Sequence, residues 1–94
     1  MSNFVKKNTV LDRVIEKANE TSDLRTLQRL TRRWGRRSEK WCSGRRDCKM
    51  WDATMALNFA ANALELRLRG DDACWIQQAR SSYYVKMFSR RVVS

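Results

Sequence analysis

The fold of this chain is decided by a stretch without charge, ATMALNFAANAL, at residues 53–64. Asn58 and Asn62 stand at helical spacing within it, and Glu65 and Arg69 continue the same narrow polar stripe. A helix that is apolar around the rest of its circumference must be covered on most sides. We therefore expect this helix either to be the central element of the fold or to form the seam of a homodimer.

Residues with capping preferences stand on both sides of this stretch. Asp47 can cap the start of the helix, and Asp52 lies in its first turn, near the positive end of the helix dipole. Arg67 and Gly70 stand at the other end, where cations and glycine are favoured. This pattern predicts a helix over residues 48–69.

Apolar spacing and capping residues predict three further helices. Thr9 can cap the first of them, Ser22 or Asp23 the second, and the pair Asp71 and Asp72 the last. The chain has no proline and three glycines, which is too little turn material for a sandwich or barrel. Its 94 residues make one domain, 1–94, and are too few for two independent cores. The prediction is an all-α, compact four-helix domain with helices at 9–20, 23–41, 48–69 and 72–92.

Gly35 lies within the second of these helices, where glycine costs roughly 1 kcal/mol relative to alanine. A stop at this glycine would leave residues 38–42 as a separate turn. Trp34 and Trp41 are seven residues apart, as one continuous helix would place them on one side. We expect the helix to continue through Gly35.

The positive charge of the chain is concentrated in one segment. The formal net charge is +10, and residues 24–46 contain nine Arg or Lys with Glu39 as the sole acid. At about 100° per residue, the cations of the second helix fall within an arc of about 140°, opposite its leucines and tryptophans. The predicted nucleic-acid-binding residues are the seven cations of this arc and the two arginines that follow: Arg25, Arg29, Arg32, Arg33, Arg36, Arg37, Lys40, Arg45 and Arg46.

A stripe of cations without interleaved acids repels itself and favours an anionic partner. Fourteen of the 20 cations are arginine, which binds phosphate through two parallel hydrogen bonds and stacks on bases. We therefore expect a non-enzymatic protein that binds nucleic acid, with DNA and RNA both open. The alternatives are a small interaction module or inhibitor that binds an acidic protein, a helix on an anionic membrane surface, and a stripe that is only solvated. Membrane binding is disfavoured because the core needs the leucines and tryptophans.

The four tryptophans, at positions 34, 41, 51 and 75, stand at helical spacing, which is more typical of a core than of base stacking. Trp41 and Trp51 flank the basic loop and are the candidates for stacking on bases.

The chain contains no histidine, which argues against general-base catalysis and against a metal site. Cys42 and Cys48 are spaced unlike the ligands of structural zinc, and a zinc site would need Asp47 or a second chain. We expect three reduced thiols, no metal, no cofactor and no catalytic residue. Residues 1–7 show no secretory signal, and no apolar run reaches the ~18 residues of a membrane span, so we expect a cytoplasmic or nucleoid-associated protein.

Overall fold

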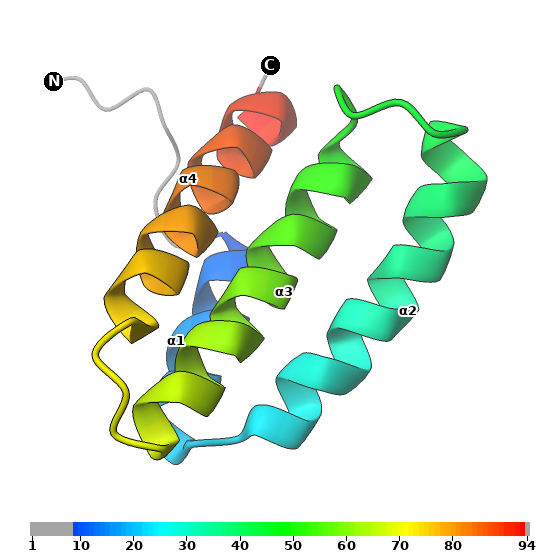
Figure 1. Ribbon diagram of the computed structural model, residues 1–94. Helices are drawn as coiled ribbons and strands as arrows, with labels where there is room; N and C mark the ends of the chain where they lie inside the picture. The colour runs from blue at the N-terminus through cyan, green and yellow to red at the C-terminus, as the bar shows by residue number, and fades with distance from the viewer. Residues whose placement is uncertain (1–8, 94) are drawn as a thin grey trace, which may run out of the picture.

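The computed structural model describes residues 9–93 and contains four α-helices in this part of the chain (Figure 1). They are α1 (Val10–Thr21), α2 (Leu24–Cys42), α3 (Lys49–Leu68) and α4 (Cys74–Val93), and successive helices run in alternating directions. No strand occurs between residues 9 and 93. The all-α prediction is confirmed, with each predicted boundary within two residues of the observed one. The expectation about a secretory signal concerns residues outside the described range.

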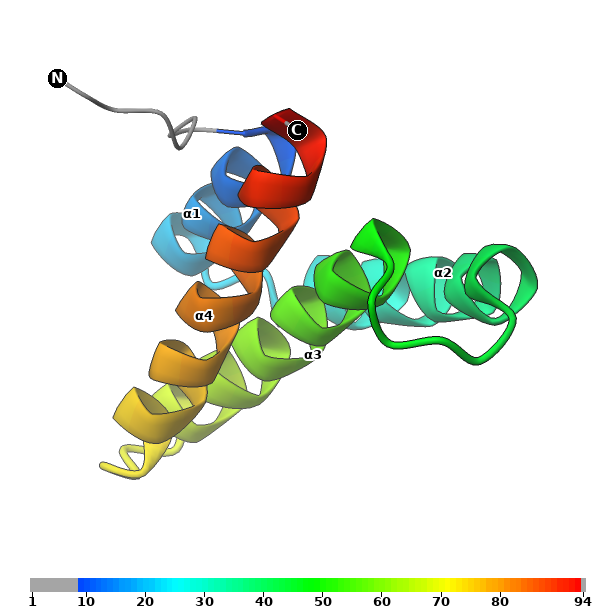
Figure 2. The same ribbon diagram turned by 90° about the horizontal axis from the view of Figure 1, so that it is seen from above.

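Helix α3 is central, as its uncharged middle predicted. It lies between α2 and α4 in both views, and α1 packs against α2 and α3 (Figures 1 and 2). Its buried apolar residues are Ala53, Ala56, Leu57, Ala60, Ala61, Ala63 and Leu64. Most of the apolar circumference of α3 is thus covered within one chain, whereas Leu68 near its end is exposed.

The core is thin, and this leaves α2 at an edge of the molecule. Leu11 and Ile15 of α1 and Leu27 of α2 are buried against α3, and Phe88 of α4 packs on the same cluster. The shortest dimension of the molecule is 20 Å, which is about the thickness of two helices. Because α3 is the main neighbour of α2, one side of α2 is packed and the other faces solvent.

The caps of α1 and α2 form as predicted. The N–H of Asp12 donates to Thr9 Oγ1 at 3.3 Å, and the N–H of Thr26 donates to Asp23 Oδ1 at 3.1 Å. The prediction for Asp47 is wrong, because the N-cap of α3 is the next residue and makes no side-chain cap hydrogen bond. The carboxylate of Asp47 instead lies 3.9 Å from Arg45 Nε in the preceding loop.

Helix α2 continues through Gly35, as predicted. Trp34 packs against the core, but Trp41 is 69% exposed, so the expectation that both lie on the packed side is wrong for Trp41. The residues that face α3 in the last turns of α2 are Ser38 and Cys42, both buried. Trp41 is rotated by about 100° from Cys42, which points its side chain toward solvent.

Candidate nucleic-acid interface

The seven predicted cations of α2 share one side of this helix, which we name the basic face: Arg25, Arg29, Arg32, Arg33, Arg36, Arg37 and Lys40. All seven side chains are exposed. The opposite side carries Leu27, which is fully buried, with Leu24 and Leu30 packed beside it. Burial of these leucines against α3 orients the helix and turns the basic face outward. The face extends for about 24 Å along the helix axis.

The cations of the basic face form no ion pair in the described part of the chain. Among residues 9–93, no carboxylate lies within 4.0 Å of its seven cations. Arg29 donates to Thr26 Oγ1 at 3.4 Å, and the Arg37 guanidinium lies 5.6 Å from the centroid of the Trp34 ring. These contacts orient two side chains but neutralise no charge. The mutual repulsion of the cations is therefore not offset by ion pairs within residues 9–93.

The carboxylate at the start of the basic face serves the helix itself. The Thr26 hydroxyl donates to Asp23 Oδ2 at 2.6 Å, and this hydrogen bond, with that from the Thr26 N–H, lowers the pKa of Asp23 from its usual 3.8. Attraction to Arg29 lowers the pKa further. Asp23 is thus ionised at neutral pH and holds the first turn of α2.

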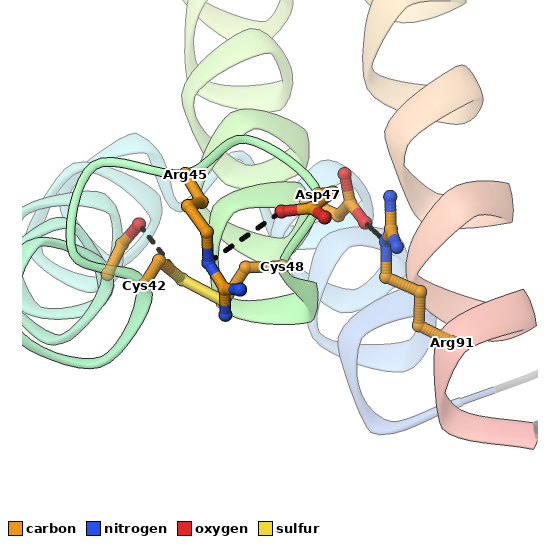
Figure 3. A network of polar contacts seen from close by, with 7 residues as sticks. Cys42, Arg45, Asp47, Cys48 and Arg91 are labelled. Carbon is orange, nitrogen blue, oxygen red and sulfur yellow. Dashed lines mark hydrogen bonds and ion pairs between the residues drawn. A yellow bond between two sulfur atoms is a disulfide. The ribbon is translucent and has the colours of Figure 1, made fainter.

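A disulfide joins Cys42 and Cys48 across residues 43–47, which we name the basic loop (Figure 3). The expectation of three reduced thiols is wrong for this pair, whereas Cys74 is free and half-buried. Ser43 and Gly44 adopt left-handed backbone, with φ of 50° and 81°, and so turn the chain back. The two Cα atoms then lie 5.9 Å apart, which is within the range of disulfides. The bonded sulfurs are not thiolates, so they do not form a zinc site in this state.

The basic loop presents its two arginines to solvent, at the C-terminal end of α2. Arg45 pairs weakly with Asp47, because both side chains are more than 70% exposed and water screens the pair. The Arg46 guanidinium lies 5.6 Å from the ring centroid of Trp51, which is half-buried. Of the two stacking candidates, Trp51 therefore already has a cation over its ring, and Trp41 is open to solvent.

Sequence reasoning missed a buried ion pair between α3 and α4. Arg91 Nε donates to Asp52 Oδ2 at 2.5 Å, and the Asp52 side chain is 3% exposed (Figure 3). The sequence suggested only that Asp52 suits the helix dipole. Its partner is 39 residues away, and no local pattern indicates such a pair. Arg91 therefore belongs to the packing of α4.

No group of three His, Cys, Asp or Glu side chains gathers within the range that the structure describes, and no helix in it is long and apolar enough to cross a membrane. Comparisons of the chain with family models, curated proteins and solved structures found no match. The function is therefore inferred from the residues of this chain.

Proposed function

We propose that this chain is a non-enzymatic nucleic-acid-binding protein that contacts phosphates through the basic face of α2 and through Arg45 and Arg46 of the basic loop. The supporting observation is the density of cations without ion pairs: seven exposed side chains lie on one face, with no carboxylate within 4.0 Å among residues 9–93. A surface that serves solubility alone interleaves both signs of charge. Phosphates supply the anions that the basic face lacks.

The kind of cation supports phosphate as the anion. Six of the seven residues of the basic face are arginine. A guanidinium donates two parallel hydrogen bonds to a phosphate and stacks on exposed bases, whereas lysine acts as a point charge. The exposed Trp41 follows Lys40 directly and offers a further stacking surface at the end of the face.

The place of α2 in the fold supports access to a nucleic acid. The helix is at the edge of a molecule whose shortest dimension is 20 Å (Figure 2). Its leucines pack against the core on the side away from the basic face. The major groove of DNA is about 12 Å wide and admits one α-helix. Structured RNA and single strands also present phosphates, so the nature of the strand is left to experiment.

A salt series tests the proposal. Binding to duplex DNA, single strands, structured RNA and heparin is measured by fluorescence anisotropy between about 50 and 200 mM salt. Each neutralised phosphate of a duplex contributes about −0.9 to the slope of log affinity against log salt. If about five of the nine cations engage, the slope is about −4 to −5, and affinity falls several-hundred-fold over this range.

The double variant Arg32→Ala/Arg36→Ala removes two cations one turn apart at the middle of the basic face. We expect weaker binding to all sequences and a slope smaller by about two, with an unchanged circular dichroism spectrum because both side chains are exposed. The matched control is Lys17→Ala/Arg90→Ala, which removes two exposed charges from α1 and α4 and should retain most of the affinity. Equal effects of the two variants, or no binding by the wild type at about 50 mM salt, would contradict the proposal.

The second candidate is an interaction module that binds an acidic protein. It is favoured by the exposed Trp41 beside the basic face, since tryptophan and arginine are the residue types that dominate protein interfaces. This candidate predicts tight binding to one acidic protein and only weak, salt-screened binding to every nucleic acid. In that case Trp41→Ala should weaken protein binding by tenfold or more.

A further inference from the structure

A hollow opens at the surface between α3 and α4. Its volume is about 360 Å³, and it is lined by Phe59, Ala79, Arg80, Tyr83 and Tyr84. The rings of Phe59 and Tyr84 are stacked, with centroids 5.8 Å apart. The Tyr83 ring stands at 85° to the Tyr84 ring, with centroids 5.1 Å apart, and Tyr83 is 58% exposed. Three aromatic rings thus line the hollow, and it suits a flat aromatic group.

The hollow also has positive charge on both sides. The Arg80 guanidinium lies 5.6 Å from the centroid of the Phe59 ring. Arg80 and Lys86 are exposed, and they lie three residues before and after Tyr83, which makes both of them its neighbours on the helix surface. No carboxylate lies within 4.0 Å of either cation among residues 9–93, and residues 74–93 include no Asp or Glu. The group that fits the hollow is therefore flat, aromatic and attached to negative charge.

An unpaired base of a nucleic-acid strand has these properties. The base supplies the flat ring, and the phosphates on either side of it supply the negative charges. Proteins hold single strands by aromatic rings that stack on the bases and by cations along the backbone, whereas a base inside a duplex must first be unstacked and unpaired. An apolar side chain of a protein partner would fill the hollow but leave Arg80 and Lys86 unused.

The hollow opens on the same side of the molecule as one edge of α2. Thr54 of α3 faces α2, because a Cβ at Gly35 would lie 3.8 Å from Thr54 Cγ2. Asn58 and the exposed Asn62 follow Thr54 at spacings of four, and Phe59 precedes Asn62 by three. Residues at these spacings are neighbours on a helix surface, so the outer side of α3 leads from α2 to the hollow, with α1 packed behind α3 (Figure 1). This uncharged part of α3 presents no acid that would repel a strand.

We propose that the hollow between α3 and α4 binds one unpaired base of a strand whose other phosphates contact the basic face, so that this protein binds single strands in preference to duplexes. The base lies against Tyr83, and Arg80 and Lys86 contact the phosphates beside it. The axes of α2 and α4 are at most about 20 Å apart, which is two helix spacings and the length of about six stacked nucleotides. The inference rests on the proposed function, because the basic face supplies most of the phosphate contacts.

Fluorescence anisotropy with a labelled single strand of about 12 nucleotides, and with a duplex of the same length, tests the base site. We expect the wild type to bind the single strand more tightly. Tyr83→Ala removes the exposed ring and should weaken single-strand binding about tenfold, with little change in duplex binding. Tyr83→Phe keeps the ring and should retain the affinity. Because Tyr83 is largely exposed, the circular dichroism spectrum of both variants should be unchanged.

The matched control for the lost ring is Trp75→Ala. Trp75 is a 67% exposed aromatic residue of the same helix that does not line the hollow, so its loss should leave both affinities unchanged.

The flanking cations are tested by Arg80→Ala/Lys86→Ala. Loss of two phosphate contacts should reduce the slope of log affinity against log salt by about 1.4 for the single strand. The control Lys17→Ala/Arg90→Ala should change this slope much less, because Arg90 lies about 10 Å beyond Tyr83 along the helix axis.

A photocrosslink locates the bound base. A single strand that contains 5-iodouracil is irradiated with the full chain, and the crosslinked peptide is identified by mass spectrometry. We expect the crosslink at Tyr83. A crosslink at Trp41 alone would place the stacked base at the end of the basic face and overturn the base site.

The outcomes distinguish the base site from the proposed function. If Arg32→Ala/Arg36→Ala weakens binding but Tyr83→Ala does not weaken single-strand binding selectively, the base site is wrong and the basic face remains a phosphate site. A wild type that binds the duplex as tightly as the single strand also overturns the base site alone. A wild type that binds no nucleic acid at about 50 mM salt overturns both.

Discussion

Helices α2 and α4 both pack on α3, but they are held there by different interactions. On α4, Arg91 pairs with the buried Asp52, and the buried Ser81 hydroxyl donates to the carbonyl of Ala56 at 2.8 Å. On α2, packing rests on Leu27 and its neighbours, with a disulfide at the C-terminal end. Charge on α4 therefore contributes to the fold, whereas the charge of the basic face makes no ion pair within residues 9–93 and stays open to a partner.

The largest expected effect concerns the ion pair of α4. Arg91→Met leaves the buried carboxylate of Asp52 without its partner and should lower the free energy of unfolding by about 3 kcal/mol, measured by denaturant titration. The control Arg90→Met changes an exposed neighbour and should alter stability by less than about 0.5 kcal/mol. Equal effects would show that packing alone holds α4.

The next effect concerns the disulfide of α2. Cys42→Ser/Cys48→Ser frees the short basic loop in the unfolded state and should lower the free energy of unfolding by about 2 kcal/mol. Reduction of the wild type by a dithiol should give a similar loss, whereas Cys74→Ser, at the free cysteine, should give a much smaller one. Wild-type stability in the double variant would mean that the leucines of α2 suffice to hold it.

A gain of stability is expected inside α2. A Cβ at Gly35 would lie 3.8 Å from Thr54 Cγ2, an ordinary contact distance, so Gly35→Ala should raise the free energy of unfolding by about 1 kcal/mol through helix propensity. Gly70→Ala should lower it, because Gly70 has φ of +75°, where a side chain is strained. A loss of stability in Gly35→Ala would show that α2 and α3 pack too closely for a methyl group.

The smallest effect is the pH dependence that comes from Asp23. Its folded-state pKa lies below 3.8, because the Thr26 side chain and backbone donate to the carboxylate. The folded state therefore prefers the ionised form, so this stabilisation is complete above pH 3.8 and is lost as the pH falls through the folded-state pKa. Asp23→Asn should flatten the acid side of the stability curve and leave its slope at neutral pH unchanged. Thr26→Val, which removes the main donor, should reproduce most of this change.

The residues that sequence reasoning placed wrongly lie near the ends of helices. Trp41 has the spacing of a core residue, but the last turns of α2 face α3 through Ser38 and Cys42. Asp47 has the chemistry of a cap, but the turn of the basic loop directs it toward Arg45. Near a helix end, a shift of one position around the helix, or the path of the following loop, decides whether a side chain is exposed. Helical periodicity determines neither of these.

The sequence by itself determined the four helices, the caps of α1 and α2 and the exposure of the basic face, because helical periodicity and capping act between residues three or four apart. Only the tertiary structure decided the Cys42–Cys48 disulfide, the Asp52–Arg91 pair and the hollow beside Tyr83. The disulfide depends on the backbone of two left-handed residues, and the ion pair and the hollow join residues on different helices. The ion pair and the hollow are set by how the helices pack, and residues so far apart in the sequence give no local signal of their contact.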